Sequence, residues 1–284
     1  MKKYLLAISG GPDSMYLLNK YKNKDIVVAH VNYGIREDAE LDTKIVSDFC
    51  IKNNIKFEIL RLQKTDFKTG NFQDWAREQR YDFFKRIYKK YNCQTLLTAH
   101  HLDDFFETAM MQKNSQRKAL FFGIKQKNII KNMIIERPLI KMFKSQILRK
   151  CIKYQIPFND DYTNFQTTYQ RNIIRMNYKS KFIQKRFKIW CFKFRNIFLK
   201  IKEKQIQKQF LIWQNSRFSQ DTFKNLKNKQ ELIFMFINQH FEKINLSKKK
   251  INSIIDFVLS NNRTSNFLLK EKTHLRKIKG KVQI

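Results

Sequence analysis

Two short stretches of this 284-residue chain carry side chains of the kinds that handle phosphate groups. The first is Ser9–Ser14, with the sequence SGGPDS, which follows the apolar run 4–8 and leads into a second apolar segment. Adjacent glycines let the backbone adopt positive φ and approach a ligand closely. The free N–H groups at a helix start form an anion site. The sequence therefore predicts a strand, a tight turn and a helix that bind a phosphate group.

The second stretch is 100–108, with the sequence HHLDDFFET, directly after the apolar run 94–99. On a helix, Asp103 and Glu107 are four residues apart and share a face, while Asp104 lies in the adjacent row. Carboxylates beside the phosphates of a nucleotide could hold Mg²⁺ through their oxygens, or receive a substrate amine. These acids could also simply favour a helix N-terminus. Their position at a strand end, in a chain poor in acids, favours the functional interpretation.

The elements that position these stretches follow from the alternation of apolar and amphipathic segments. Apolar runs at 4–8, 25–31, 56–60 and 94–99 predict buried strands, and helices are predicted between them, including 38–53 and 72–91. This alternation predicts an α/β fold with a doubly wound, mostly parallel sheet. The carboxyl ends of parallel strands form the ligand crevice. His30 and Asn32, at the end of the second strand, are therefore expected beside the phosphate-binding loop.

The charge of the chain indicates a polyanionic partner. The chain has 58 Lys and Arg residues against 24 acidic ones, a formal net charge of +34, which favours RNA, DNA or an anionic surface. Residues 181–284 contain 25 of these cationic residues but only 6 of the acidic ones. We expect two domains, 1–180 and 181–284, the second a basic, mainly helical region. Its lysines suit either a solvated surface or RNA phosphate contacts.

Helical spacing at 181–213, 220–241 and 247–260 places Phe and Trp residues, including Trp190 and Trp213, in the core of this second region. For the end of the chain, from residue 266, the sequence allows either a strand or a frayed tail. Four widely spaced cysteines without a CxxC pair argue against a zinc knuckle or a local redox pair. The sequence lacks an apolar stretch long enough to span a membrane, so we expect a cytoplasmic protein.

In residue type, order and spacing, residues 4–178 resemble the tRNA(Ile)-lysidine synthases, a family of PP-loop ATPases with an adenine nucleotide alpha hydrolase-like fold. The resemblance rests on SGGPDS, HVNYGIRED, WAREQRY, AHHLDDFFET and RPLI, followed by DDYTN and RNIIR. The chain departs from the family pattern at Phe105, where a Gln is usual, and at 113–115, where the usual Arg-Gly is absent. These departures leave the role of the loop at 113–130 open.

The resemblance implies a reaction in two steps. O2 of the wobble cytidine (position 34) of an isoleucine tRNA with a CAU anticodon attacks the α-phosphate of ATP, and pyrophosphate leaves. The ε-amine of free L-lysine then attacks C2 of the adenylated cytidine and displaces AMP, which leaves lysidine. Such a ligase uses ATP and Mg²⁺. Monomer and homodimer both remain open.

The resemblance also implies roles for individual residues. Asp13 and Asp104 are expected to hold Mg²⁺, and His100 or His101 to polarise the base or move a proton. Asp103 or Glu107 is expected to bind the lysine amine. Arg171 and Arg175 are expected to contact RNA. The expected catalytic residues are Asp13, His100, His101 and Asp104. The expected ATP-binding residues are Ser9, Gly10, Gly11, Pro12, Asp13, Ser14, His30 and Asn32.

Two alternatives remain open. A PP-loop tRNA thiolase would use the same adenylation step, but such enzymes generally rely on reactive cysteines, and Cys93 is expected at the opposite end of the sheet. A basic RNA-binding protein that has lost catalysis would explain the charge. The intact SGGPDS and HHLDD segments argue against that loss, and ATP–pyrophosphate exchange would separate the two functions.

Overall fold

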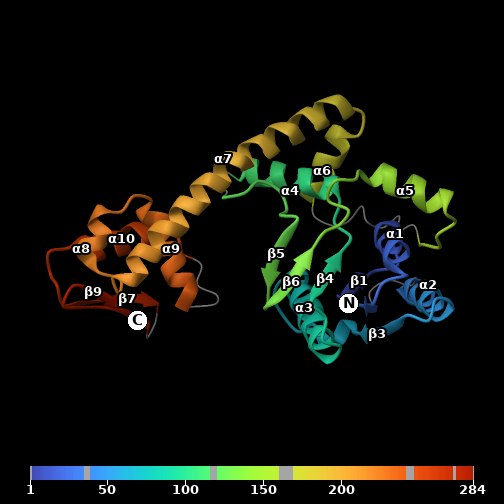
Figure 1. Cartoon of the computed structure of the whole chain (residues 1–284), viewed down its shortest axis with the longest axis horizontal. Coiled ribbons are helices and arrows are strands. Elements are labelled where there is room, and N and C mark those ends of the chain that lie inside the picture. Colours follow the sequence, from blue (N-terminus) through green and yellow to red (C-terminus); the bar gives the residue numbers. More distant parts are fainter. Residues whose placement is uncertain are drawn as a thin grey trace. The chain divides into compact units, whose positions relative to one another are not determined.

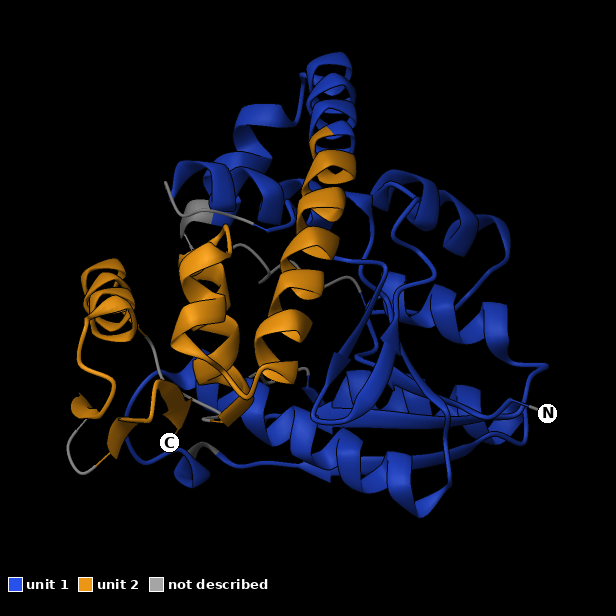
Figure 2. Cartoon of the chain, turned by 60° about the vertical axis from the view of Figure 1, so that its left-hand side comes forward, with its two compact units in different colours: residues 1–194 blue, residues 195–284 orange. Residues whose placement is uncertain are grey.

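The computed structural model describes residues 2–34, 39–115, 120–159, 169–240, 246–270 and 273–283. The chain forms two compact units, residues 1–194 and 195–284 (Figure 2). The boundary between them falls inside helix α7 (Phe182–Asn215), whereas the sequence suggests a boundary at 180/181. Each unit has its own apolar core.

The first unit is built on a six-stranded sheet in the order β3-β2-β1-β4-β6-β5 (Figure 1). Its parallel strands β3, β2, β1, β4 and β6 are followed at one edge by β5, which pairs with β6 antiparallel. The strands are β1 Tyr4–Ile8, β2 Ile26–Asn32, β3 Lys56–Arg61, β4 Thr95–Thr98, β5 Lys127–Ile130 and β6 Met133–Glu136. β1 is hydrogen-bonded to both β2 and β4, so the segments that follow these three strands meet at one edge of the sheet.

Helices cover both faces of this sheet, which confirms the predicted doubly wound fold. Leu6, Val28 and Leu97 face one core, which also contains buried residues of α1, α2 and α5. Leu5, Val27 and Leu96 face the other core, together with Tyr81, Phe83, Phe84 and Ile87 of α3. This alternation follows from the two-residue period of a strand. The helices of this unit are α1 Pro12–Tyr21, α2 Ala39–Lys52, α3 Phe72–Lys90, α4 Leu102–Asn114, α5 Lys144–Lys153 and α6 Tyr169–Tyr178, with a short 3₁₀ helix at Lys64–Asp66.

The second unit combines helices with a small antiparallel sheet. Its core surrounds Trp213, which is completely buried and donates a hydrogen bond from Nε1 to the carbonyl of Ser219 at 3.0 Å. The end of the chain forms strands, one of the two outcomes that the sequence left open. After the second half of α7, the elements are α8 Gln220–Asn225, α9 Lys229–His240, α10 Lys248–Leu259, β7 Ser265–Lys270, β8 Thr273–Ile278 and β9 Lys281–Gln283. Strand β8 pairs with both β7 and β9.

The two tryptophans assigned to a helical core have different environments. The prediction is confirmed for Trp213 and wrong for Trp190, whose side chain is 60% exposed on α7. The physical reason is that the first half of α7 is apolar on two sides. Ile189 and Phe192 are buried against the first unit, and Trp190 faces away from them. Among the described residues, no helix is both long enough and apolar enough to cross a membrane.

The contrast between these residues yields a stability prediction. Trp213→Ala removes a fully buried ring and its hydrogen bond, so we expect a loss of about 3–5 kcal/mol in the free energy of unfolding. Trp190→Ala removes an exposed ring, and we expect a change within about 0.5 kcal/mol. Urea unfolding of both variants, followed by circular dichroism, checks this pair. Equal losses for the two would contradict the burial of Trp213.

Candidate active site

The SGGPDS loop lies between β1 and α1, as the sequence predicts. Gly10 has φ of +95°, a conformation that residues with a Cβ rarely adopt. A Cβ at this position would lie only 2.7 Å from Oδ1 of Asp42, a buried residue of α2. Gly10 is therefore required both by its backbone conformation and by the close packing of α2 beneath the loop.

Hydrogen bonds within the loop fix its shape. Oγ of Ser14 accepts hydrogen bonds from the backbone N–H of Ser9 at 3.1 Å and from the Ser9 hydroxyl at 3.2 Å. The Ser14 hydroxyl donates in turn to the carbonyl of Gly11 at 2.9 Å. Pro12 occupies the first turn of α1, and no side chain caps this helix start in the described structure. The first N–H groups of α1 thus remain available to an anion.

The second stretch connects β4 to α4 beside this loop. His101 is the N-cap of α4, and its backbone N–H donates to Oδ2 of Asp104 at 2.8 Å. The Thr98 hydroxyl lies 2.9 Å from Nδ1 of His100, which fixes that ring at the end of β4. Because β1 and β4 are parallel neighbours, these residues and the SGGPDS loop converge.

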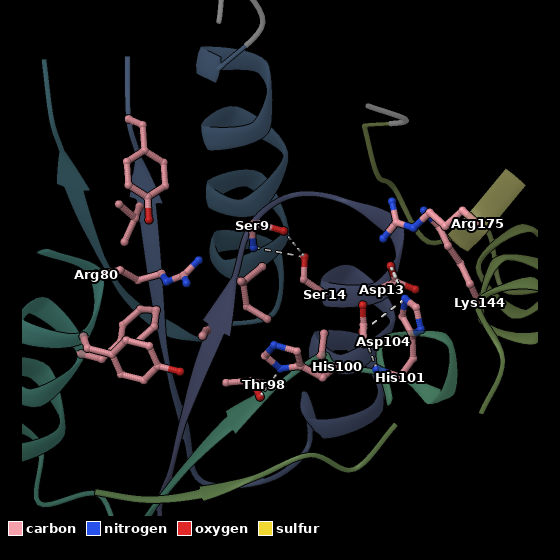
Figure 3. A pocket seen from close by; sticks show the side chains of 17 residues that line it. Ser9, Asp13, Ser14, Arg80, Thr98, His100, His101, Asp104, Lys144 and Arg175 are labelled. Carbon is pink, nitrogen blue, oxygen red and sulfur yellow. Dashed lines mark hydrogen bonds and ion pairs between the residues drawn. The ribbon is translucent and has the colours of Figure 1, made fainter. Parts of the chain in front are cut away.

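A cavity of about 310 Å³ lies where the two stretches meet (Figure 3). Ser9, Asp13 and Ser14 line it from the loop, and His100, His101 and Asp104 line it from the second stretch. The structure therefore brings together the four residues predicted to be catalytic and three of those predicted to bind ATP.

Asp13 and Asp104 converge on the imidazole of His101. Nε2 of His101 lies 3.6 Å from Oδ2 of Asp13 and 3.5 Å from Oδ2 of Asp104. Burial of His101 opposes its protonated form, but the hydrogen bond to Asp13 and the charges of the surrounding carboxylates outweigh it and raise the pKa of His101. The ring of His101 thus lies between two carboxylates that favour its protonated form.

His100 has the opposite electrostatic environment. Burial of the ring is the largest cause and lowers the pKa of His100 to about 4. The charge of Asp104 opposes this decrease, whereas the charges of Arg137 and Arg80 add to it. His100 is therefore neutral at pH 7, with a ring nitrogen that can accept a proton. The pKa values of two adjacent histidines are thus shifted in opposite directions.

The acids around this cavity fit a magnesium ion that is shared with a nucleotide. Oδ1 of Asp13 is buried and has no hydrogen-bond partner in the described structure. Within the described residues, no group of three or more His, Cys, Asp or Glu side chains forms a complete metal site. Mg²⁺ usually binds one or two carboxylates together with substrate phosphates and water. Asp13 and Asp104 fit that pattern.

Asp103 and Glu107 are paired with cations of the chain itself. Asp103 accepts from the backbone N–H of Lys144 at 2.7 Å and from the ammonium group of Lys185. Glu107 is 2% exposed and binds Arg175 through two hydrogen bonds, from Nε at 2.6 Å and from Nη2 at 3.2 Å. Neither carboxylate lines the cavity. The structure thus places the residues expected to bind lysine in ion pairs that fasten α7 and α6 to α4.

His30 and Asn32 lie outside the cavity. His30 is buried, and its ring nitrogens contact the carbonyl of Ile8 at 2.9 Å and the Thr43 hydroxyl at 3.1 Å. Burial lowers the pKa of His30, so the ring is neutral at pH 7. Asn32 donates to Oε1 of Glu40 at 2.8 Å and accepts from the N–H of Gly34 at 2.9 Å. His30 therefore lies beside the residue that precedes the loop, as expected, but neither side chain enters the cavity. Both side chains hold β2 to α2.

The cavity also contains residues to which sequence reasoning assigned no role. Arg80 and Tyr81 of α3 line it, as do Tyr33 after β2 and Lys144 at the start of α5. Burial raises the pKa of Tyr33, and the charge and hydrogen bond of Arg80 oppose this shift. In Figure 3, Arg80 lies on the opposite side of the loop from Asp13, Asp104 and His101. The WAREQRY segment could have indicated this position, because it places Arg80 beside the aromatic Tyr81 on a helix that packs on the sheet.

The two arginines expected to contact RNA differ in their surroundings. Arg175 lines the cavity and binds Glu107, whereas Arg171, one turn earlier on α6, has no ion pair among the described residues. The DDYTN segment at 160–164 and the residues at 35–38 lie outside the described residues.

Comparison with known proteins identifies relatives of the whole chain. Residues 1–181 match the family model described as a PP-loop domain. The tRNA(Ile)-lysidine synthase of Mycoplasmopsis pulmonis is 46% identical, over 99% of this chain and 98% of the relative. The tRNA(Ile)-lysidine synthase of Mesomycoplasma hyopneumoniae is 42% identical, over 99% of this chain and 95% of the relative. Among solved structures, the U34-tRNA thiolase NcsA of Methanococcus maripaludis, determined with its [4Fe-4S] cluster, has a TM-score of 0.57 at 21% identity. That match covers 70% of this chain and 73% of the thiolase, and it shows the fold alone.

The close approach of α2 to the loop predicts the effect of a Cβ at Gly10. Gly10→Ala introduces both an unfavourable φ and a clash with Asp42, so we expect it to destabilise the protein and to weaken ATP binding strongly. Gly70→Ala is the matched control, because Gly70 has φ of +103° but open space around its Cβ position. For Gly70→Ala we expect a loss of about 1 kcal/mol from φ alone. Unfolding and calorimetric ATP titration check both. Equal effects of the two would contradict the packing of Asp42 under the loop.

The ion pair of Glu107 predicts different effects for two arginines on one helix. Arg175→Met leaves the buried carboxylate without its partner, so we expect a loss of about 3 kcal/mol or more in the free energy of unfolding. Arg171→Met is the matched control, with an expected change within about 0.5 kcal/mol. Adding Glu107→Gln to Arg175→Met should restore part of the lost stability, because no charge then remains buried. Denaturant unfolding measures the free energy of unfolding of these variants. Equal stability of the two single variants would contradict the ion pair.

Proposed function

The chain belongs to the tRNA(Ile)-lysidine synthases, ATP-using ligases of the PP-loop family, and we propose how its residues carry out each step. In this reaction ATP activates the wobble cytidine of an isoleucine tRNA with a CAU anticodon, and free lysine then replaces the AMP. The observation that carries the proposal is the convergence of the SGGPDS loop, Asp13 and the HHLDD segment on one cavity.

In the first step, the loop from Ser9 to Ser14 binds the phosphates of ATP. The N–H groups at the start of α1 have no side-chain cap in the described structure, and they would stabilise the charge that develops on the departing pyrophosphate. Mg²⁺ held by Asp13 and Asp104, directly or through water, would neutralise negative charge on the phosphates. The ring of His101 lies within 3.6 Å of both carboxylates and would keep them together.

In the second step, the lysine amine must lose a proton before it attacks C2. We propose His100 as the acceptor, because burial keeps its ring neutral at pH 7 and the Thr98 hydroxyl engages Nδ1. In the proposed tautomer Nδ1–H donates to Oγ1 of Thr98, so that the lone pair of Nε2 accepts the proton. His101 is protonated more readily and suits a positioning role instead.

We propose that the amine of lysine is received beside Asp104 and that Asp103 and Glu107 hold α7 and α6 against α4. Support comes from their surroundings, since Asp104 lines the cavity whereas the other two acids bind Lys185 and Arg175. Arg80 would bind an anionic group of a substrate, either a phosphate of ATP or the carboxylate of lysine.

The RNA would bind through the basic surface of the chain, including Arg171 on α6 and the mainly helical region after residue 180. A guanidinium that has no ion pair among the described residues, as at Arg171, is free to bind phosphate. Arg175 would contribute through its contact with Glu107 and its position at the cavity.

A thiolase function is less well supported by the thiols of this chain. Cys50, Cys93 and Cys151 are buried, and burial raises the pKa of Cys50 to about 12 and those of Cys93 and Cys151 to about 11. Such thiols are poor nucleophiles at neutral pH. No cysteine lines the cavity.

The proposal predicts incorporation of labelled lysine into an unmodified isoleucine tRNA with a CAU anticodon, dependent on ATP and Mg²⁺. Asp13→Asn and Asp104→Asn should each lower the initial rate by about 100-fold or more, because each removes a carboxylate that neutralises phosphate charge through the metal. Asp256→Asn, at an exposed acid of α10, is the matched control and should retain the wild-type rate. Incorporation that persists in Asp13→Asn would contradict the role of the loop. Absence of incorporation by the wild-type protein, with tRNA binding intact, would contradict the lysidine reaction.

A further inference from the structure

The first half of α7 carries an exposed row of aromatic rings. Phe187, Trp190 and Phe194 lie three and four residues apart, so they share one side of the helix. Their side chains are 62%, 60% and 47% exposed. We define these three residues as the α7 aromatic face.

The rings of this face form one continuous stack. The centroids of Phe187 and Trp190 are 6.1 Å apart with an interplanar angle of 25°, and those of Trp190 and Phe194 are 5.6 Å apart at 13°. Nearly parallel rings of this kind present a broad π surface to solvent. An exposed aromatic cluster of this size marks an interaction surface more often than a free monomer surface.

The opposite side of the same helix segment holds it to the first unit. Ile189 and Phe192 are buried, and the Phe192 ring lies 5.3 Å from that of Phe122. The Lys185 ammonium pairs with Asp103, whose Oδ2 lies 3.5 Å from Nδ1 of His101. The α7 aromatic face is therefore presented by a helix that is anchored to the active-site wall.

Cations flank the aromatic face without matching acids. Residues 182–194 contain Lys185, Arg186, Lys188 and Lys193 but no Asp or Glu. Burial lowers the pKa of Lys193, and the charge of nearby Lys141 lowers it further. Neither of these two lysines has an ion pair among the described residues. An anionic partner would relieve this repulsion.

From these observations we propose that the α7 aromatic face binds unpaired nucleotides of the substrate tRNA, whose bases stack on the rings while Arg186 and Lys193 contact the phosphates. Aromatic rings with flanking cations are the usual way in which proteins bind single-stranded RNA. The same face of a second copy fits this surface poorly, because residues 182–194 would bring further cations and no acids to the contact. The inference rests on the proposed function, since it takes a tRNA as the substrate.

The test compares the affinity of the full-length protein for an unmodified isoleucine tRNA transcript with a CAU anticodon. Loss of one base–aromatic stack should weaken binding roughly 5- to 150-fold in Trp190→Ala. Trp190→Phe, which keeps a ring, should retain most of the affinity. Ile152→Ala, at an exposed apolar residue of α5, is the matched control and should bind as the wild type does. Thermal unfolding verifies that every variant is folded.

Salt dependence separates stacking from charge. Arg186→Gln combined with Lys193→Gln should reduce the slope of log affinity against log salt by about 1.4, the value for two phosphate contacts in single-stranded RNA. Trp190→Ala should leave this slope unchanged. Unchanged affinity in Trp190→Ala would overturn the proposal. So would a change in sedimentation of Trp190→Ala without a change in tRNA affinity, which would identify the face as a contact between copies.

Lysine incorporation at saturating tRNA distinguishes this inference from the function on which it rests. Trp190→Ala should then reach the wild-type maximal rate, because the face binds RNA and does not touch the reacting groups. Weaker tRNA binding by Trp190→Ala, in a protein whose wild type incorporates no lysine, would support the RNA surface and contradict the ligase function. If Trp190→Ala binds tRNA with wild-type affinity and lysine is incorporated normally, the ligase function would be supported and the RNA surface contradicted.

Discussion

The active site depends on two carboxylates that meet at one buried imidazole. Asp13 follows β1, Asp104 follows β4, and His101 lies within 3.6 Å of both because these strands are parallel neighbours. Two carboxylates at such a distance repel each other, and burial increases the cost. The raised pKa of His101 is consistent with this, because protonation of its ring offsets the repulsion.

Ion pairs extend from this centre to the helices that follow the sheet. Asp103 holds Lys185 at the start of α7, and Glu107 holds Arg175 on α6. In a chain with a net charge of +34, acids are the scarce residues, and several of them are used here to fasten cationic helices to α4. Much of the remaining positive charge lies on the surface, where it favours a polyanionic substrate. The scarcity of acids therefore accounts both for the ion pairs at α4 and for the cationic surface.

Much of the fold and the centre of the site could be predicted because their signals are local. An apolar run, two glycines and a helix start fix the loop at Gly10, and strand order brings Asp104 beside it. The remaining errors have physical causes. A strand-end position places His30 beside the loop but does not tell whether its side chain enters the cavity. Helical spacing identified the apolar sides of α7 but not that Trp190 faces solvent. Arg80 reaches the cavity only because α3 packs on the sheet, a contact between segments far apart in sequence.

The most direct test of the central claim follows the α-phosphate of ATP in the absence of lysine. The protein is incubated with ATP labelled at the α-phosphate, Mg²⁺ and the unmodified isoleucine tRNA. A site that adenylates cytidine should transfer the label to the RNA and release pyrophosphate, and added lysine should then release the label as AMP. Formation of labelled ADP and inorganic phosphate, with no label on the RNA, would contradict this account of the site.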